Sequence, residues 1–126
     1  MKLRFMVLVL LMFVTLVWVG LLAPGRARAQ TSDECIHAPT ISSLRTCVQH
    51  AADEGFIDNQ GVTNSLLAKL DAAQAALDRG QTSVAINNLE AFIYEVQAQA
   101  GKHIQQEHAG QLVEHAQVVI QALKNG

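Results

Sequence analysis

The stretch that decides the fold is GVTNSLLAKLDAAQAALDRG, residues 61–80. Its apolar side chains recur at intervals of four, four, three and four residues, which is the period of a helix and not of a strand. The positions are Val62, Leu66, Leu70, Ala73 and Leu77. Gly80 suits a left-handed helix end, and Arg79 lies favourably at the negative end of the helix dipole. We therefore predict a helix that begins within residues 58–61 and ends at residues 79–80.

Three further segments of the chain have the same period. They run from about Thr40 to Glu54, from Thr82 or Ser83 to about Ala100, and from about Gln105 to Lys124. Pro39 and Thr40 suit the start of the first of these helices, and Thr82 or Ser83 is the expected N-cap of the second. Gly55 and Gly101 are the expected stops. The positions expected to be buried are Ile41, Leu44, Val48 and Ala51, then Ile86, Leu89, Ile93, Val96 and Ala100 with Phe92 beside this stripe, then Leu112, Val113, Ala116, Val119, Ile120 and Leu123.

Short connections between these segments predict how the helices pack. Connections of two to six residues make neighbouring helices antiparallel, and Phe56 and Ile57 are expected to close one end of the core. Nine alanines lie between Leu66 and Ala100, and small side chains let helices approach closely. The predicted fold class is all-α, a small up-and-down bundle of about four helices that follows an N-terminal signal or anchor helix.

Charge excludes one class of partner. The chain has 126 residues, and the part from Gln30 onward carries five basic and 11 acidic residues, a formal charge of −6. Phosphate contacts need clustered lysine and arginine, so we expect no nucleic-acid partner. Aromatic residues of this part are restricted to Phe56, Phe92 and Tyr94, too few for a stacking surface that binds bases or sugars.

Residues 1–29 are typical of an export signal. Lys2 and Arg4 precede an apolar run over residues 5–23, and small residues at Ala27 and Ala29 predict cleavage between Ala29 and Gln30. The alternative is an uncleaved membrane anchor, because 19 residues of helix nearly span a bilayer core of roughly 30 Å. Both interpretations make residues 30–126 secreted or extracytoplasmic, with contact to a membrane only through residues 5–23. The expected divisions are 1–29 signal, 30–39 loose N-terminal segment and 40–126 helical bundle.

The two cysteines, Cys35 and Cys47, agree with export. Two cysteines in an oxidising compartment form a disulfide with each other by default. In the chain-entropy model, closing this loop contributes about 3 kcal/mol to the stability of the folded state. A redox-active pair is disfavoured because no Cys-x-x-Cys motif occurs. A reduced Cys47 packed in the core is the other interpretation.

A series of motifs in the last three predicted helices resembles the FIMAH domain, a helical module usually found at the C-terminus of exported bacterial proteins. The resemblance covers roughly Ile41 to Leu123. The family name reads as a short sequence motif, and the chain matches only its first two residues, at Phe92-Ile93, before it continues with Tyr94-Glu95-Val96. The segments that carry it are Ser65–Leu70, Ala76–Gly80, Ala85–Ile93 and Gln99–Lys102. In the family the module accompanies enzymes or adhesion repeats and has no catalytic residues. The resemblance therefore implies an accessory or interaction role.

The histidines are the candidate metal ligands. His103, Glu107, His108 and His115 lie at or near the last helix. His108 and His115 are two turns apart, about 10 Å, which is too far for one ion, and His103 with Glu107 makes a weak pair. We expect these side chains to form a solvated polar face, with no resident metal or other cofactor.

Other candidate chemistry is weaker still. Residues 58–61, DNQG, are similar to the start of a calcium loop, but Val62 falls where a ligand is needed, so a polar helix cap is expected. Asp71 and Asp78 are expected on a solvated face rather than in a catalytic cleft. No serine lies in a Gly-x-Ser-x-Gly elbow. We expect the protein not to be an enzyme.

The sequence thus predicts an exported, non-catalytic helical module that mediates protein–protein or cell-surface interaction. The expected surface is a glutamine-rich helix face, with adaptable hydrogen-bonding groups at Gln97, Gln99, Gln105, Gln106, Gln111 and Gln117. The alternative is a small extracytoplasmic metal-binding protein that uses the histidines of the last helix.

Overall fold

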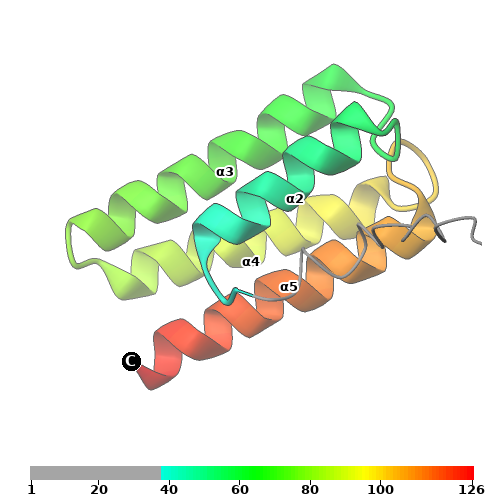
Figure 1. Cartoon of the computed structure of the whole chain (residues 1–126). Helices are drawn as coiled ribbons and strands as arrows, with labels where there is room; N and C mark the ends of the chain where they lie inside the picture. Colours follow the sequence, from blue (N-terminus) through cyan, green and yellow to red (C-terminus); the bar gives the residue numbers. More distant parts are fainter. Residues whose placement is uncertain (1–37) are drawn as a thin grey trace, which may run out of the picture.

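The computed structural model describes residues 38–126, which form four α-helices (Figure 1). The helices are α2 (Ile41–Asp53), α3 (Gln60–Asp78), α4 (Thr82–Gln99) and α5 (Gln106–Asn125). Each matches a predicted segment, and the β-structure of the described residues is limited to two isolated bridges. The predicted all-α fold is confirmed.

Several predictions concern the chain before residue 38. The signal or anchor over residues 5–23, the cleavage between Ala29 and Gln30, and Cys35 lie outside the described residues. Within residues 38–126, no helix is both long and apolar enough to cross a membrane.

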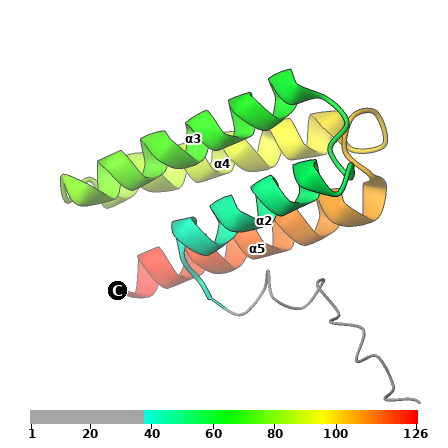
Figure 2. The same ribbon diagram turned by 45° about the horizontal axis from the view of Figure 1, so that its top comes forward.

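The helices pack in a closed ring. α2 packs on α3, α3 on α4, α4 on α5, and α5 returns to α2. Figure 2 shows α3 and α4 on one side of the bundle and α2 and α5 on the other. The α2–α3 and α4–α5 connections meet at one end, and the α3–α4 turn lies at the opposite end (Figure 1). This is the up-and-down arrangement that the short connections predicted.

The core is made of aliphatic side chains around one aromatic ring. Phe92 is fully buried, and so are three alanines of α3 and α4 at positions 73, 76 and 85. The largest aliphatic side chains with them are Leu44, Val48, Leu66, Leu70, Leu89, Val96, Ile104 and Val119. Small residues in the α3–α4 contact let those helices approach while Phe92 fills the space between the other side chains.

The buried stripe of α4 differs from the prediction. Its buried residues are Ala85, Leu89, Phe92 and Val96, whereas Ile86 and Ile93 are only partly buried. The two isoleucines lie roughly 90° around the helix from that stripe, at about 100° per residue. Leu77, Ala100, Val113 and Leu123, also expected to be buried, are likewise only partly buried. The interior of the bundle therefore takes one bulky ring and one small alanine from α4, at Phe92 and Ala85, and leaves the two branched side chains at its margin.

The caps confirm most of the predicted helix starts. The Thr40 side chain accepts a hydrogen bond from the Ser43 amide at 3.2 Å, and Asn59 accepts one from the Val62 amide at 3.1 Å. The polar segment before α3 is therefore a helix cap, as expected. The predicted cap at Thr82 or Ser83 is wrong, since Gln81 occupies that position without a side-chain bond. Gly80 ends α3 in the left-handed conformation, with φ of 71°. The Gln81 amide then donates a hydrogen bond to the Ala76 carbonyl at 2.9 Å.

Polar pairs join the helices at the bundle surface. Lys69 of α3 and Glu95 of α4 form an ion pair at 2.5 Å, and the Ser65 hydroxyl donates to the same carboxylate at 2.8 Å. Arg45 of α2 pairs with Asp71 of α3, which is exposed as predicted. Such surface pairs contribute little stability compared with burial of the core.

A matched pair of substitutions in α4 tests this packing. We expect Phe92→Ala to lower the free energy of unfolding by about 3–5 kcal/mol, because it removes a buried ring and leaves a cavity. Tyr94→Ala, two residues later and exposed, is expected to change it by less than about 0.5 kcal/mol. Urea unfolding followed by circular dichroism measures both. Equal losses in the two variants would contradict this orientation of α4.

Candidate functional site

An open groove of about 720 Å³ lies between α4 and α5. Because these helices are antiparallel neighbours, they bring together residues that lie 17 or more positions apart in the chain. The groove is lined by Glu90, Ile93, Tyr94 and Gln97 from α4 and by Glu114, Gln117, Val118, Ile120, Gln121 and Lys124 from α5.

Tyr94 is the most exposed large apolar residue in the described part of the chain. It is 72% exposed, and Val118 across the groove is 40% exposed. The helical period explains this placement, since Tyr94 lies about 200° around α4 from the buried Phe92. Ile93 and Ile120 lie deeper, one partly buried and one buried. The groove therefore has an apolar floor with an aromatic ring at its edge.

Polar side chains surround this floor. Glu90 on α4 and Glu114 on α5 are exposed carboxylates, and Lys124 is the one basic residue among those that line the groove. The groove is thus mildly acidic. Its amide groups come from Gln97, Gln117 and Gln121.

The predicted glutamine face is only partly assembled. Of the six glutamines expected there, Gln97 and Gln117 line the groove, while Gln99, Gln105, Gln106 and Gln111 do not. Gln99 and Gln105 serve the α4–α5 connection through their backbones. Sequence reasoning missed Tyr94, Val118 and Gln121. Their signal was present, because Gln121 follows Gln117 by four residues and so lies on the same helix face.

His103 lies at the end of the bundle where two connections meet. Its Nδ1 is 2.9 Å from Asp58 Oδ1, and both side chains are largely exposed. The backbones of the two connections are also joined, with the Asp58 amide donating to the His103 carbonyl and the Gln105 amide to the Phe56 carbonyl. Ile57 and Ile104 bridge beneath them and are buried. The expected closure of this end of the core by residues 56 and 57 is confirmed, and the His103 side chain lies on the outside of it.

His108 has a different environment. Its ring stacks on Phe56 with centroids 3.6 Å apart and planes 18° from parallel. The Nδ1 atom is buried and has no hydrogen-bond partner within residues 38–126. His108 is half-buried, so the expectation of a fully solvated side chain is wrong here. Stacking on the connector ring accounts for its position.

His115 is buried, contrary to the predicted solvated face. It is 1% exposed, with Nδ1 3.5 Å from Cys47 Sγ and Nε2 3.0 Å from the Ala38 carbonyl oxygen. Position 115 lies at the edge of the α5 stripe that faces α2, so the ring enters the core with both nitrogens in polar contact. The seven-residue repeat with His108 concealed this difference, because equal spacing along a helix does not give equal tertiary neighbours.

The candidate metal ligands have separate surroundings. His103 contacts Asp58, His108 stacks on Phe56, His115 contacts Cys47, and Glu107 is exposed. Within the described residues, no group of three His, Cys, Asp or Glu side chains is placed to hold a metal ion. The geometry therefore gives no support to the metal-binding alternative.

A zinc titration tests this conclusion. We expect calorimetry of the folded chain with zinc to give no saturable heat, because ligands that lie apart from one another bind an ion weakly. His103→Ala and His108→Ala should leave the signal unchanged. Saturable binding that either substitution abolishes would contradict the geometry.

The comparisons with known proteins agree with the fold. No curated protein and no solved structure matches the chain. The family model described as the FIMAH domain matches residues 41–121, from the start of α2 to near the end of α5. This range contains α2, α3, α4 and most of α5, and it includes the lining of the groove except Lys124. The chain belongs to the FIMAH domain family.

Proposed function

We propose that this protein is an exported, non-catalytic interaction module that binds a protein partner through the groove between α4 and α5. The observation that carries the proposal is Tyr94, which is 72% exposed beside an apolar floor. Tyrosine offers a large contact area with few rotatable bonds and is enriched among residues that dominate binding energy. An exposed ring of this kind is costly to keep in water and gains from a partner.

The chemistry of the groove favours binding over catalysis. Its lining contains no serine, cysteine or histidine, the side chains that most often act as nucleophile or general base. Its amide groups are suited to adaptable hydrogen bonding.

The shape and charge of the groove indicate the kind of partner. A groove between two antiparallel helices accepts the apolar face of a third helix, with side chains of one helix fitting between those of the others. Glu90 and Glu114 flank the apolar floor, and the chain from Gln30 onward has a formal charge of −6. The partner segment that fits is an amphipathic helix with basic residues beside its apolar face.

The compartment proposed for this binding is extracytoplasmic. The support is the sequence of residues 1–29, with its basic start, apolar run and small residues before Gln30. A disulfide between Cys35 and Cys47 belongs to the same proposal. Cys35 precedes Ala38 by three residues, a span of at most about 11 Å, and the Ala38 carbonyl contacts the imidazole that also contacts Cys47. The bond would attach the N-terminal segment to α2.

Site-directed cross-linking tests the binding surface. We expect a photoreactive residue in place of Tyr94 to cross-link to one defined protein in cells that produce the chain. The same residue in place of Ala72, exposed on α3, should give no such product. Val118→Glu should reduce the yield at position 94 because it introduces a charge beside the apolar floor. Glu114→Lys should also reduce it if the partner is basic.

Three results would contradict this assignment. They are equal labelling from positions 94 and 72, products that contain only polysaccharide, and labelling at position 94 that Val118→Glu leaves unchanged. The last result would place the partner outside the groove.

An intact-mass measurement tests export and the disulfide. We expect protein recovered from the culture medium to begin at Gln30 and to weigh two hydrogens less than after reduction. Recovery from the membrane fraction with residues 5–23 retained would contradict cleavage and favour the anchor. An unchanged mass on reduction would contradict the disulfide.

A further inference from the structure

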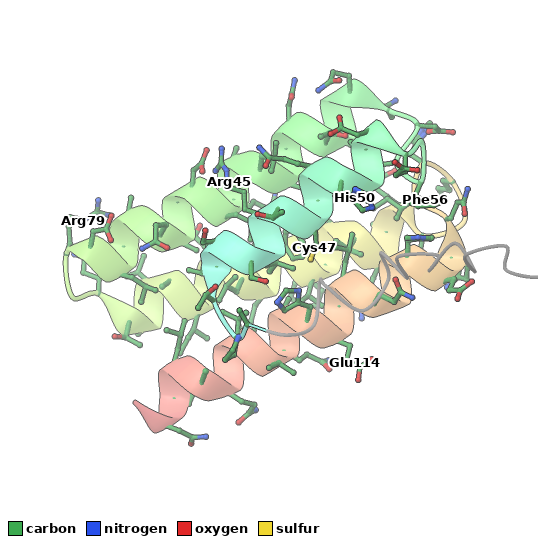
Figure 3. The ribbon with its side chains drawn as sticks, viewed as in Figure 1. Arg45, Cys47, His50, Phe56, Arg79 and Glu114 are labelled. Carbon is green, nitrogen blue, oxygen red and sulfur yellow. The ribbon has the colours of Figure 1, made fainter. Side chains whose placement is uncertain are left out.

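The charged side chains of the groove are unevenly distributed along it. Glu90, Glu114 and Lys124 are the charged residues of its lining. On α5, Glu114 precedes Lys124 by ten residues, which is about 15 Å along the helix axis. Glu114 points outward from α5 (Figure 3), and Lys124 lies in the last turn of that helix. One wall of the groove therefore changes from acidic to basic along its length.

The up-and-down topology identifies the two ends of the groove. Glu114 lies on the half of α5 that is nearer the α4–α5 connection, whereas Lys124 lies near the end of α5 on the side of the α3–α4 turn (Figure 1). Glu107, seven residues before Glu114 and so on nearly the same face of α5, extends the acidic surface toward the connection. Lys102 belongs to the connection itself and does not line the groove.

The dipoles of the two groove helices do not reverse this difference. Because α4 and α5 lie side by side in opposite directions, the partial charge at the start of one helix is opposed by the partial charge at the end of the other. An occupant of the groove therefore distinguishes its two ends mainly through the charged side chains of the lining.

A helix that occupies the groove has two different ends of its own. Its first N–H groups have no partner within the helix and carry partial positive charge, and its last carbonyl groups carry partial negative charge. The 15 Å or so between Glu114 and Lys124 correspond to about ten helical residues, or roughly three turns. The carboxylate and the ammonium group are thus spaced to reach opposite ends of one short helix.

We propose that the groove binds a helix of about three turns in one direction, parallel to α5, with its N-terminal end at Glu114 and its C-terminal end at Lys124. The proposal rests on the function proposed above and adds the length and direction of the partner segment. Glu90, on the α4 wall, faces a basic residue beside the apolar face of the partner.

The opposite direction is disfavoured at both ends. A charge at a helix end changes an equilibrium by about two- to fivefold. Reversal of the bound helix replaces two favourable end contacts by two unfavourable ones, so we expect a preference of about tenfold or more at low salt. Raising the salt concentration should weaken this preference, because exposed charges are screened.

A spin-labelled peptide tests the direction. The probe is a synthetic amphipathic helix of three to four turns, with leucines at the i, i+3, i+4 and i+7 positions and lysines spread evenly beside them. Acetyl and amide groups block its termini, so that its own side chains and end groups do not set the direction. We expect a nitroxide at its N-terminal end to broaden the amide NMR signals of residues 110–114 of the isotope-labelled protein, and a nitroxide at its C-terminal end to broaden those of residues 121–125.

An exchange of charges provides the decisive variant. Glu114→Lys combined with Lys124→Glu keeps the composition and net charge of the chain but exchanges the two ends, so it should reverse which label broadens which signals. The matched control is Arg45→Asp combined with Asp71→Arg, which exchanges an ion pair between α2 and α3 outside the groove and should leave the direction unchanged.

The outcomes separate this proposal from the one on which it rests. Equal broadening at both ends from either label, or a direction that the Glu114 and Lys124 exchange leaves unchanged, would overturn the direction and leave the groove as the binding site. A peptide that broadens only signals of α2 and α3, or none, would overturn both proposals. If the double variant does not fold, Glu114→Gln and Lys124→Gln replace it, and each should reduce the preference at least about twofold; an unchanged preference in both would refute the proposal.

Discussion

The orientation of α4 determines the rest of the structure. Ala85, Leu89, Phe92 and Val96 form its buried stripe, and Phe92 is the largest side chain of that stripe, so burial of its ring contributes most to that orientation. Once Phe92 faces inward, the helical period turns Tyr94 outward. The groove and its exposed ring are thus consequences of core packing, which links a stability constraint directly to the proposed binding surface.

Much of the fold could be predicted from the chain because the helices are punctuated locally. Thr40 and Asn59 cap their helices by bonds within three residues, and Gly80 ends α3 with the left-handed conformation that glycine adopts freely. Apolar period and short connections then limited the topology to an antiparallel bundle. The prediction failed where two sets of residues on α4 fit the helical period equally well and only one of them is buried. Ile86 and Ile93 match a helical stripe as well as Ala85 and Phe92 do, and only the fit against α3 and α5 decides between them.

The candidate site was less predictable because it depends on contacts between helices. Tyr94 could be placed opposite Phe92 only after the α4 stripe was known, and Val118 lines the same groove only because α5 returns beside α4. His115 shows the same limit more sharply. Nothing near it in the chain indicates that it meets Cys47, 68 residues away, or the Ala38 carbonyl, so a histidine that seemed to belong to a polar face lies in the core. The sequence resemblance, by contrast, was confirmed over residues 41–121 because it depends on the pattern itself.

Hydroxyl-radical footprinting with mass spectrometry tests the orientation of α4 most directly, since Phe92 and Tyr94 fall in one short peptide. Both rings react with the radical when water reaches them, so their relative modification reports which faces solvent. The account predicts rapid modification of Tyr94 and none at Phe92 until the protein is unfolded. Comparable modification of the two rings in the folded protein, or faster modification of Phe92, would contradict it.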